Sequence, residues 1–177
     1  MGEQVCTSLG ARVDQTQARA GGTMSQTLRQ VFEVYIRTTP DKLWETLTNG
    51  DLTKLYFFGG VARSDWKAGS AYEFVDEDGD TMHFGEVIES VAPRKLVYTF
   101  NAGYRSESDR DPASRVTYEI APAGEACKLT VLHEHYAGET ETSKGTFVGW
   151  NQILSGLKTL LETGRPLQLP SPEETPA

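Results

Sequence analysis

The chain has 177 residues, of which 38% are hydrophobic, and its formal net charge is -8. This length predicts one domain with terminal extensions, since single domains commonly have about 100–150 residues. The acidic balance disfavours a nucleic acid or an anionic membrane as the main partner, because both attract basic surfaces. No apolar run reaches the roughly 18 residues of a membrane span.

Both ends of the chain differ from its middle. Residues 1–27 are rich in Gln, Thr, Ala and Gly without a sustained hydrophobic period, which predicts a disordered leader. Residues 165–177 hold four of the eight prolines and predict a proline-rich, extended tail. The folded domain is therefore expected over residues 28–164. The leader lacks a signal-peptide segment, and Cys6 and Cys127 make no disulfide framework, so a cytoplasmic location is predicted.

The first expected elements are a strand and two helices. Residues 30–38 alternate between apolar and polar side chains, which indicates a half-buried strand. A helix is predicted next, from a Thr39 cap with Pro40 in the first turn to a stop at Gly50. The stretch DLTKLYFFGG, residues 51–60, predicts a second, short helix that two glycines end.

Six strand-like runs follow, separated by turn signals. They are residues 61–65, 70–75, 82–91, 95–101, 114–121 and 127–136. Two stretches between them, Asp76–Asp80 and Ala121–Ala126, predict hairpin turns. Strands at this spacing without intervening helices predict an antiparallel sheet.

The last expected element is a long amphipathic helix over about residues 142–163, which stops at Gly164. Its apolar side chains fall between roughly 60° and 200° on a helical wheel. They are Phe147, Trp150, Ile153, Leu154, Leu157, Leu160 and Leu161. Gly145, Gly149 and Gly156 lie beside this stripe and should allow another backbone to come close.

The order of elements is thus strand, two helices, six strands and a long helix. An α+β fold is expected, in which a curved antiparallel sheet wraps around the C-terminal helix and buries its apolar stripe. Such a sheet closes poorly on a single helix. We therefore predict a cavity between the two, lined by apolar and aromatic side chains.

This pattern resembles the helix-grip superfamily of START-like and Bet v 1-like (SRPBCC) ligand-binding proteins. The stretches that carry the resemblance span about residues 32–167; they are TTPDKLWETLTNGDLTKLYF, WKAGSAYEF, HFGEVIESVAPRKLVYTF, LTVLHEHYAGE and GWNQILSGLKTLLETGRPL. Within the superfamily, the chain looks like the branch named after the C-terminal domain of the Hsp90 ATPase activator. The resemblance implies binding of apolar molecules in the cavity, and some relatives are polyketide cyclases or dehydratases. His135 departs from the pattern, because a small residue commonly follows this His-Glu pair.

The predicted ligand-binding residues are those expected to face the cavity from the sheet and from the last helix. They are Tyr72, Phe74, Tyr98, Phe100, Tyr118, His133, His135, Trp150, Leu154 and Leu157. Tyr98 and Tyr118 are expected opposite Trp150, because each shares a strand face with apolar neighbours two residues away.

His133 and His135 stand two apart in one strand-like run. Side chains alternate along a strand, so both should face the helix near the cavity mouth, while Tyr136 points the other way. Two histidines are too few for a zinc site, which takes three or four protein ligands. No metal, no other cofactor and no catalytic residue is assigned, and both histidines are expected to be hydrogen-bonded at the pocket rim.

The sequence therefore predicts a domain that binds a small apolar or aromatic molecule. One alternative is a cyclase- or dehydratase-type enzyme, in which His133, His135 or a cavity tyrosine moves protons. Another is a module that docks on a chaperone through its sheet, although no sequence feature supports a protein partner directly. A deep aromatic cavity would favour the first two, and a filled core with a broad apolar outer patch would favour the third.

Overall fold

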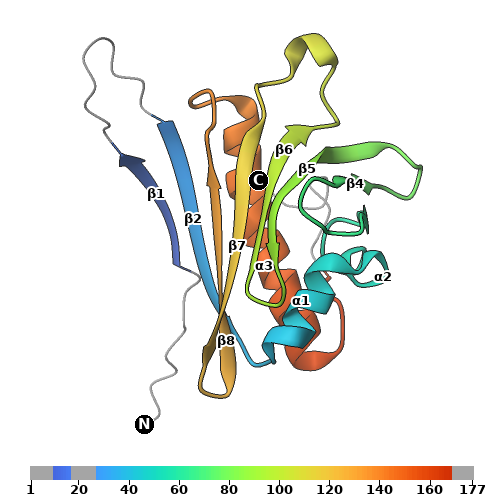
Figure 1. Cartoon of the computed structure of the whole chain (residues 1–177), viewed down its shortest axis with the longest axis vertical. Coiled ribbons are helices and arrows are strands. Elements are labelled where there is room, and N and C mark those ends of the chain that lie inside the picture. Colours follow the sequence, from blue (N-terminus) through green and yellow to red (C-terminus); the bar gives the residue numbers. More distant parts are fainter. Residues whose placement is uncertain (1–9, 17–26, 169–177) are drawn as a thin grey trace.

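A computed structural model describes residues 10–16 and 27–168 (Figure 1). Within these ranges, eight antiparallel strands form one sheet in the order β1-β2-β8-β7-β6-β5-β4-β3. The strands are β1 (Gly10–Thr16), β2 (Thr27–Ile36), β3 (Val61–Arg63), β4 (Ala71–Val75), β5 (Thr81–Val91), β6 (Lys95–Ala102), β7 (Ser114–Ala123) and β8 (Ala126–Glu134). The helical elements of the same ranges are α1 (Pro40–Thr48), α2 (Gly50–Thr53), the 3-10 turn η1 (Glu107–Asp109) and α3 (Glu141–Thr163).

The predicted α+β, helix-grip arrangement is confirmed. Figure 1 shows α3 running behind the curved sheet, with α1 and α2 beside the end of the sheet where α3 finishes. The apolar stripe of α3 joins the inward side chains of the sheet in one core, to which it contributes Trp150, Ile153, Leu154 and Leu157. The sheet and the helix therefore bury each other, as the wheel predicted.

Strand β1 differs from the expectation. It lies inside residues 1–27, which were predicted to be a disordered leader, and it pairs antiparallel with β2 along its whole length. Pairing along the edge of a sheet uses backbone groups, so it needs no hydrophobic period in the added strand. Leader residues 1–9 and 17–26, and the predicted tail beyond Gln168, lie outside the described residues.

Local capping signals set the helix boundaries. The hydroxyl of Thr39 accepts a hydrogen bond from the Lys42 backbone N–H at 3.3 Å and caps α1. At the start of α3, the Thr140 hydroxyl accepts from the Ser143 N–H at 3.2 Å, and the Ser143 hydroxyl accepts from the Thr140 N–H at 2.9 Å. Gly164 ends α3 with a φ of 73°, a conformation in which glycine has no Cβ clash.

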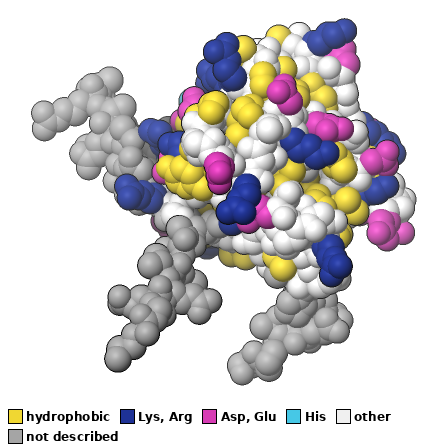
Figure 2. All heavy atoms as spheres, turned by 90° about the horizontal axis from the view of Figure 1, so that it is seen from below, with side chains coloured by type: hydrophobic (Ala, Val, Ile, Leu, Met, Phe, Trp, Pro, Cys, Tyr) yellow, Lys and Arg dark blue, Asp and Glu magenta, His cyan; other side chains and the backbone are white. Residues whose placement is uncertain are grey.

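The exterior is mixed in character. Figure 2 shows basic and acidic side chains interspersed with hydrophobic ones on the lower end of the molecule. Among the described helices, none is both long and apolar enough to cross a bilayer.

Gly85 is a point of close approach between β5 and β6. A Cβ atom at this position would overlap the carbonyl oxygen of Thr99 and would lie 2.6 Å from the Thr99 hydroxyl. That carbonyl already accepts a hydrogen bond from the Tyr72 hydroxyl at 2.8 Å, and the Thr99 hydroxyl accepts from the Glu86 N–H at 2.9 Å. A side chain at residue 85 would therefore have to displace both strands.

We expect Gly85→Ala to lower the free energy of unfolding by about 1–3 kcal/mol, the usual cost of overpacking, measured by chemical denaturation. Gly145→Ala is the matched control, because a Cβ there meets no atom within 4 Å. That exchange lies in a helix and should raise stability by up to about 1 kcal/mol. Equal effects of the two exchanges would contradict the close approach at Gly85.

Candidate ligand-binding site

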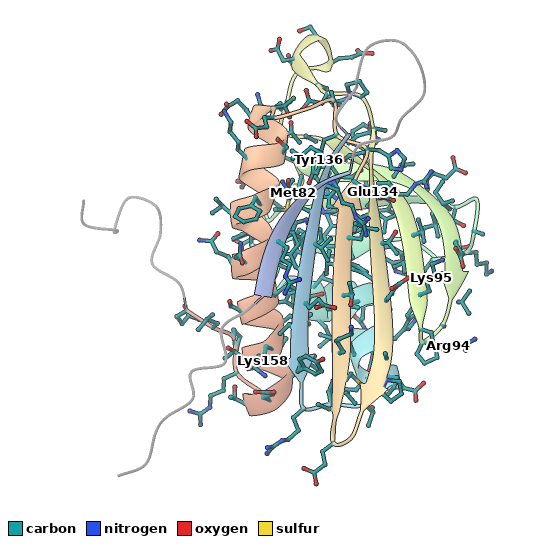
Figure 3. All side chains as sticks on the ribbon, turned by 90° about the vertical axis from the view of Figure 1, so that its left-hand side faces the viewer. Met82, Arg94, Lys95, Glu134, Tyr136 and Lys158 are labelled. Carbon is teal, nitrogen blue, oxygen red and sulfur yellow. The ribbon has the colours of Figure 1, made fainter. Side chains whose placement is uncertain are left out.

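An aromatic pocket of about 130 Å³ lies between the first turns of α3 and the sheet. Three segments supply its lining, namely the turn after α2, the neighbouring ends of β5 and β6, and one side of α3. The lining residues are Phe57, Phe58, Met82, His83, Phe100, Tyr104, Gly145, Thr146, Gly149, Trp150 and Ile153. Figure 3 places Met82 at the same end of the molecule as Tyr136, far from Lys158 near the end of α3.

The glycines of α3 create space at this pocket. A Cβ at Gly145 would meet no atom within 4 Å, and one at Gly149 would meet only the Phe58 ring, at 3.8 Å. The prediction that these glycines allow close backbone approach is therefore wrong for Gly145 and Gly149. It holds for Gly156, where a Cβ would lie 3.2 Å from the Cβ of Tyr56. The three glycines share a helix side, but of the three only Gly156 lies against the backbone of another segment.

The predicted site residues are divided between the pocket and the core. Phe100 and Trp150 line the pocket. Seven others are buried in the core or next to it; they are Tyr72, Phe74, Tyr98, Tyr118, His133, Leu154 and Leu157. The Tyr98 hydroxyl donates to the Tyr118 hydroxyl at 2.9 Å, and both rings fill the space opposite the middle of α3. The pocket therefore lies at one end of the helix–sheet interface instead of along its whole length.

Another hollow, of about 560 Å³, lies beside β4 and β5 and includes Tyr72, Phe84 and Arg110. The guanidinium of Arg110 is already engaged there. Its Nε donates to the Ala102 carbonyl at 2.9 Å, its Nη2 donates to the Arg105 carbonyl at 3.1 Å, and it lies 4.9 Å from the Phe84 ring centroid. We therefore regard the smaller aromatic pocket as the candidate site.

His133 is buried behind Trp150, with both ring nitrogens engaged. Its Nδ1 accepts a hydrogen bond from the Trp150 indole at 3.1 Å, and its Nε2 lies 2.7 Å from the Ser114 hydroxyl. An indole N–H can only donate, so Nδ1 is unprotonated and Nε2 carries the proton that it donates to Ser114. Burial, reinforced by His83, lowers the pKa of His133 well below its ordinary value. His133 therefore holds Trp150 in place as a neutral ring and does not lie at the rim.

His135 does not share the face of His133. Strand β8 ends before it, and its φ of 64° breaks the strand alternation, in a conformation that histidine tolerates better than most residues. His135 is exposed, and Tyr136 turns inward. The Tyr136 hydroxyl donates to Gln30 Oε1 at 3.1 Å and lies 2.7 Å from the Thr146 hydroxyl. The predicted orientations of His135 and Tyr136 are therefore wrong, because the strand is shorter than its apolar pattern.

His83 is one of several pocket residues that are absent from the predicted set, and it is the one with a titratable side chain buried in the lining. Its ring stacks on Phe74 and Phe100, with centroids 4.3 and 5.0 Å away. Its Nδ1 lies 3.4 Å from the Tyr72 hydroxyl, and its Nε2 is buried without a hydrogen-bond partner. Burial lowers the pKa of His83 to about 3. The alternation of β5 could have found it, because His83 has the same parity as the buried Val87.

Metal-binding geometry is not found in the part of the chain that the structure describes, where no group of three or more His, Cys, Asp or Glu side chains could hold an ion.

Comparison with known proteins identifies the family. The profile described as "Activator of Hsp90 ATPase homolog 1-like protein" matches residues 37–162, most of the chain. The chain belongs to this family. No curated protein matches it.

Several solved structures share the fold of this family member. CalU16 from Micromonospora echinospora has a TM-score of 0.67 at 18% identity, over 94% of this chain and 89% of CalU16. The Aha1 dimer from Colwellia psychrerythraea has a TM-score of 0.63 at 18% identity, over 77% and 97% of the two chains. DynU16, from the dynemicin biosynthetic locus, has a TM-score of 0.64 at 22% identity, over 77% and 48%. At these identities the likeness shows the fold.

The two buried histidines should make the stability of this family member fall in acid. Their folded-state pKa values lie below the ordinary value of 6.5, so the unfolded chain takes up protons first. The stabilisation is present above about pH 6.5 and is lost as the pH falls toward the folded-state pKa. Between pH 7.5 and 5.0, His83 should lower the free energy of unfolding by about 2 kcal/mol, and His133 should lower it further, as measured by denaturant titration.

His83→Phe should reduce this pH dependence, and the exposed His135→Gln is the control that should keep it. An unchanged pH dependence in His83→Phe would show that His83 is accessible to protons in the folded protein.

Proposed function

We propose that this protein binds a small apolar or aromatic molecule in the pocket between α3 and the ends of β5 and β6. The observation that supports this most directly is the space left by Gly145 and Gly149 against a wall of aromatic rings. Its volume of about 130 Å³ resembles cavities of about 150 Å³, which admit a benzene-sized ligand. A single aromatic ring, free or part of a larger molecule, therefore fits the space.

The walls of the pocket are held in place before a ligand arrives. Trp150 is 3% exposed and is fixed through its hydrogen bond to His133. It packs edge-on to Phe57, with ring centroids 6.1 Å apart. A ligand ring would gain from leaving water, about 2.5 kcal/mol per 100 Å² of apolar surface, without ordering these side chains first.

The pocket has a route to solvent past two half-exposed aromatics. Phe58 and Tyr104 both line it, and they are 52% and 61% exposed. Phe58 also has a φ of 51°, an uncommon conformation for a bulky residue. Two glycines follow it directly. This local geometry directs a large ring to the pocket mouth.

The geometry favours binding over the enzyme alternative. His133 has no free nitrogen, and His135 is exposed outside the pocket lining. Burial raises the pKa values of the tyrosines Tyr98 and Tyr118 well above their ordinary value. His83 reaches the pocket, but with a pKa of about 3 it is a weak proton acceptor near neutral pH.

The geometry also gives little support to a docking role for the sheet. The large exposed apolar residues of the described central strands include Tyr35 on β2 and Ile88 on β5. Strands β8, β7 and β6 separate these two strands, so the two side chains do not form one patch. The origin of DynU16 in the dynemicin biosynthetic locus adds support for a role in small-molecule chemistry.

Toluene is a suitable test ligand, because it is apolar and contains a single ring. We expect saturable toluene binding that shifts the NMR signals of Phe100, Trp150 and Ile153. Gly149→Leu should fill the pocket and weaken binding at least about tenfold, which corresponds to the burial of roughly two CH₂ groups. Its melting temperature should not fall, because the new side chain enters empty space and leucine favours a helix more than glycine does.

Val148→Leu is the matched control, since residue 148 is on the same helix but is 58% exposed and does not line the pocket. It should bind toluene like the parent protein. Toluene shifts confined to the outer face of the sheet, or undiminished binding by Gly149→Leu, would refute the pocket as the site.

A further inference from the structure

We propose that the pocket selects an aromatic ring carrying one hydrogen-bond donor, with phenol as the simplest case, and that Nε2 of His83 accepts this hydrogen bond. This selectivity depends on the ligand binding proposed above and names the chemical class of the ligand.

Tyr72 determines which nitrogen of His83 carries the proton. The single hydroxyl proton of Tyr72 is donated to the Thr99 carbonyl at 2.8 Å. At its 3.4 Å contact with His83, the Tyr72 oxygen must therefore accept, and Nδ1 of His83 must donate. In a neutral imidazole the other nitrogen is then a bare acceptor. Nε2 of His83 thus carries an unshared lone pair.

His83, the residue that carries this lone pair, lines the pocket. In the described residues, four buried side-chain polar atoms have no hydrogen-bond partner, and they are Arg29 Nε, His83 Nε2, Arg105 Nε and Thr142 Oγ1. His83 alone among these four residues lines the aromatic pocket. Nδ1 is directed to Tyr72, which does not line this pocket, so Nε2 lies on the part of the ring away from Tyr72. A buried polar atom is stabilised when it gains a partner.

Two other polar groups of the lining, on Trp150 and Thr146, are already used, and the third polar side chain, Tyr104, is 61% exposed. The Trp150 indole donates to His133 at 3.1 Å. The Thr146 hydroxyl donates to the Ser143 carbonyl at 3.1 Å and lies 2.7 Å from the Tyr136 hydroxyl. Among the described residues that line the pocket, no Lys, Arg, Asp or Glu is present. A carboxylate ligand would therefore find no counter-charge, and a ketone oxygen would face an acceptor, whereas an O–H or N–H donor would be paired.

Three ligands of similar shape separate the hydrogen bond from apolar burial. Phenol offers one donor, anisole has the same oxygen without a donor, and toluene has neither. In a purely apolar pocket phenol binds more weakly than toluene, because its hydroxyl loses water without compensation. Here we expect phenol to bind at least as tightly as toluene and on the order of tenfold more tightly than anisole, measured by NMR titration of the full chain at pH 7.

His83→Phe removes the acceptor and preserves an aromatic ring between Phe74 and Phe100. In this variant the ratio of phenol to toluene affinity should fall on the order of tenfold, while Val148→Leu should keep the ratio of the parent protein. If toluene binds but the ratio is the same with and without His83, the donor selectivity is refuted and the apolar pocket stands. If neither toluene nor phenol binds in the pocket, the proposed function itself fails.

A second measurement needs no variant and decides the matter even if His83→Phe does not fold. Long-range ¹H–¹⁵N correlation spectra of the imidazole ring report which nitrogen is protonated. We expect protonated Nδ1 and unprotonated Nε2 for His83 in the ligand-free protein, with a shift of the Nε2 signal on phenol addition. A protonated Nε2 would overturn the proposal, because that nitrogen would then require an acceptor from the ligand.

Discussion

The hydrogen bond from Trp150 to His133 joins the long helix to the sheet where the filled core meets the pocket. His133 passes the connection to Ser114 on β7, and the Ser114 hydroxyl donates to the Phe100 carbonyl on β6 at 3.4 Å. One chain of polar groups therefore links α3 to three adjacent strands inside an apolar interior. Removing one member of such a buried chain destabilises the fold, because its partners are left as buried polar groups without a hydrogen bond. The same bond fixes the indole whose face forms a wall of the pocket.

The aromatic side chains of the sheet limit where a ligand can enter. Tyr98 and Tyr118 bond to each other and pack edge-on, with centroids 5.6 Å apart. Tyr118 also packs against Trp150 at 5.9 Å. These rings occupy the middle of the helix–sheet interface, and the aromatic pocket lies beyond them, beside Gly145 and Gly149. The pocket is thus bounded on one side by a packed aromatic core and on the other by side chains at the surface.

Much of the fold was predictable from the sequence, because it depends on the hydrophobic period of each element and on the residues that end helices and form turns. The apolar stripe of α3, the alternation of β2 and the turn at Asp76–Asp80 all act locally, and they predicted the elements and their order. Strand β1 was not predictable in this way, since its pairing with β2 uses backbone groups and gives no periodic signal. The end of β8 was also not predicted, because the pattern of apolar residues does not indicate the positive φ at His135.

The candidate site was less predictable, because it depends on which side chains fill the space between elements. Residue type and parity predicted Trp150 and Phe100 at the cavity, and both line the pocket, but they could not show that Tyr98 and Tyr118 would close its centre. His83 has the strand parity of a buried residue, but the predicted site included His133 and His135 and not His83. Nε2 of His83 is left as an acceptor because Nδ1 contacts Tyr72 on another strand. The spacing of residues along the chain does not predict that contact.

The side of α3 at Gly145 and Gly149 carries no side chains, so the pocket volume can change there without a change in the packing that stabilises the fold. These two residues lie one turn apart and contribute no side chain, so each added methyl group would subtract volume from the pocket without touching the core. A lineage with this architecture could therefore change the size of its ligand by single substitutions, while the sheet, the caps of α3 and the Trp150–His133 contact stay the same. Ligand size would then evolve much faster than the scaffold that holds it.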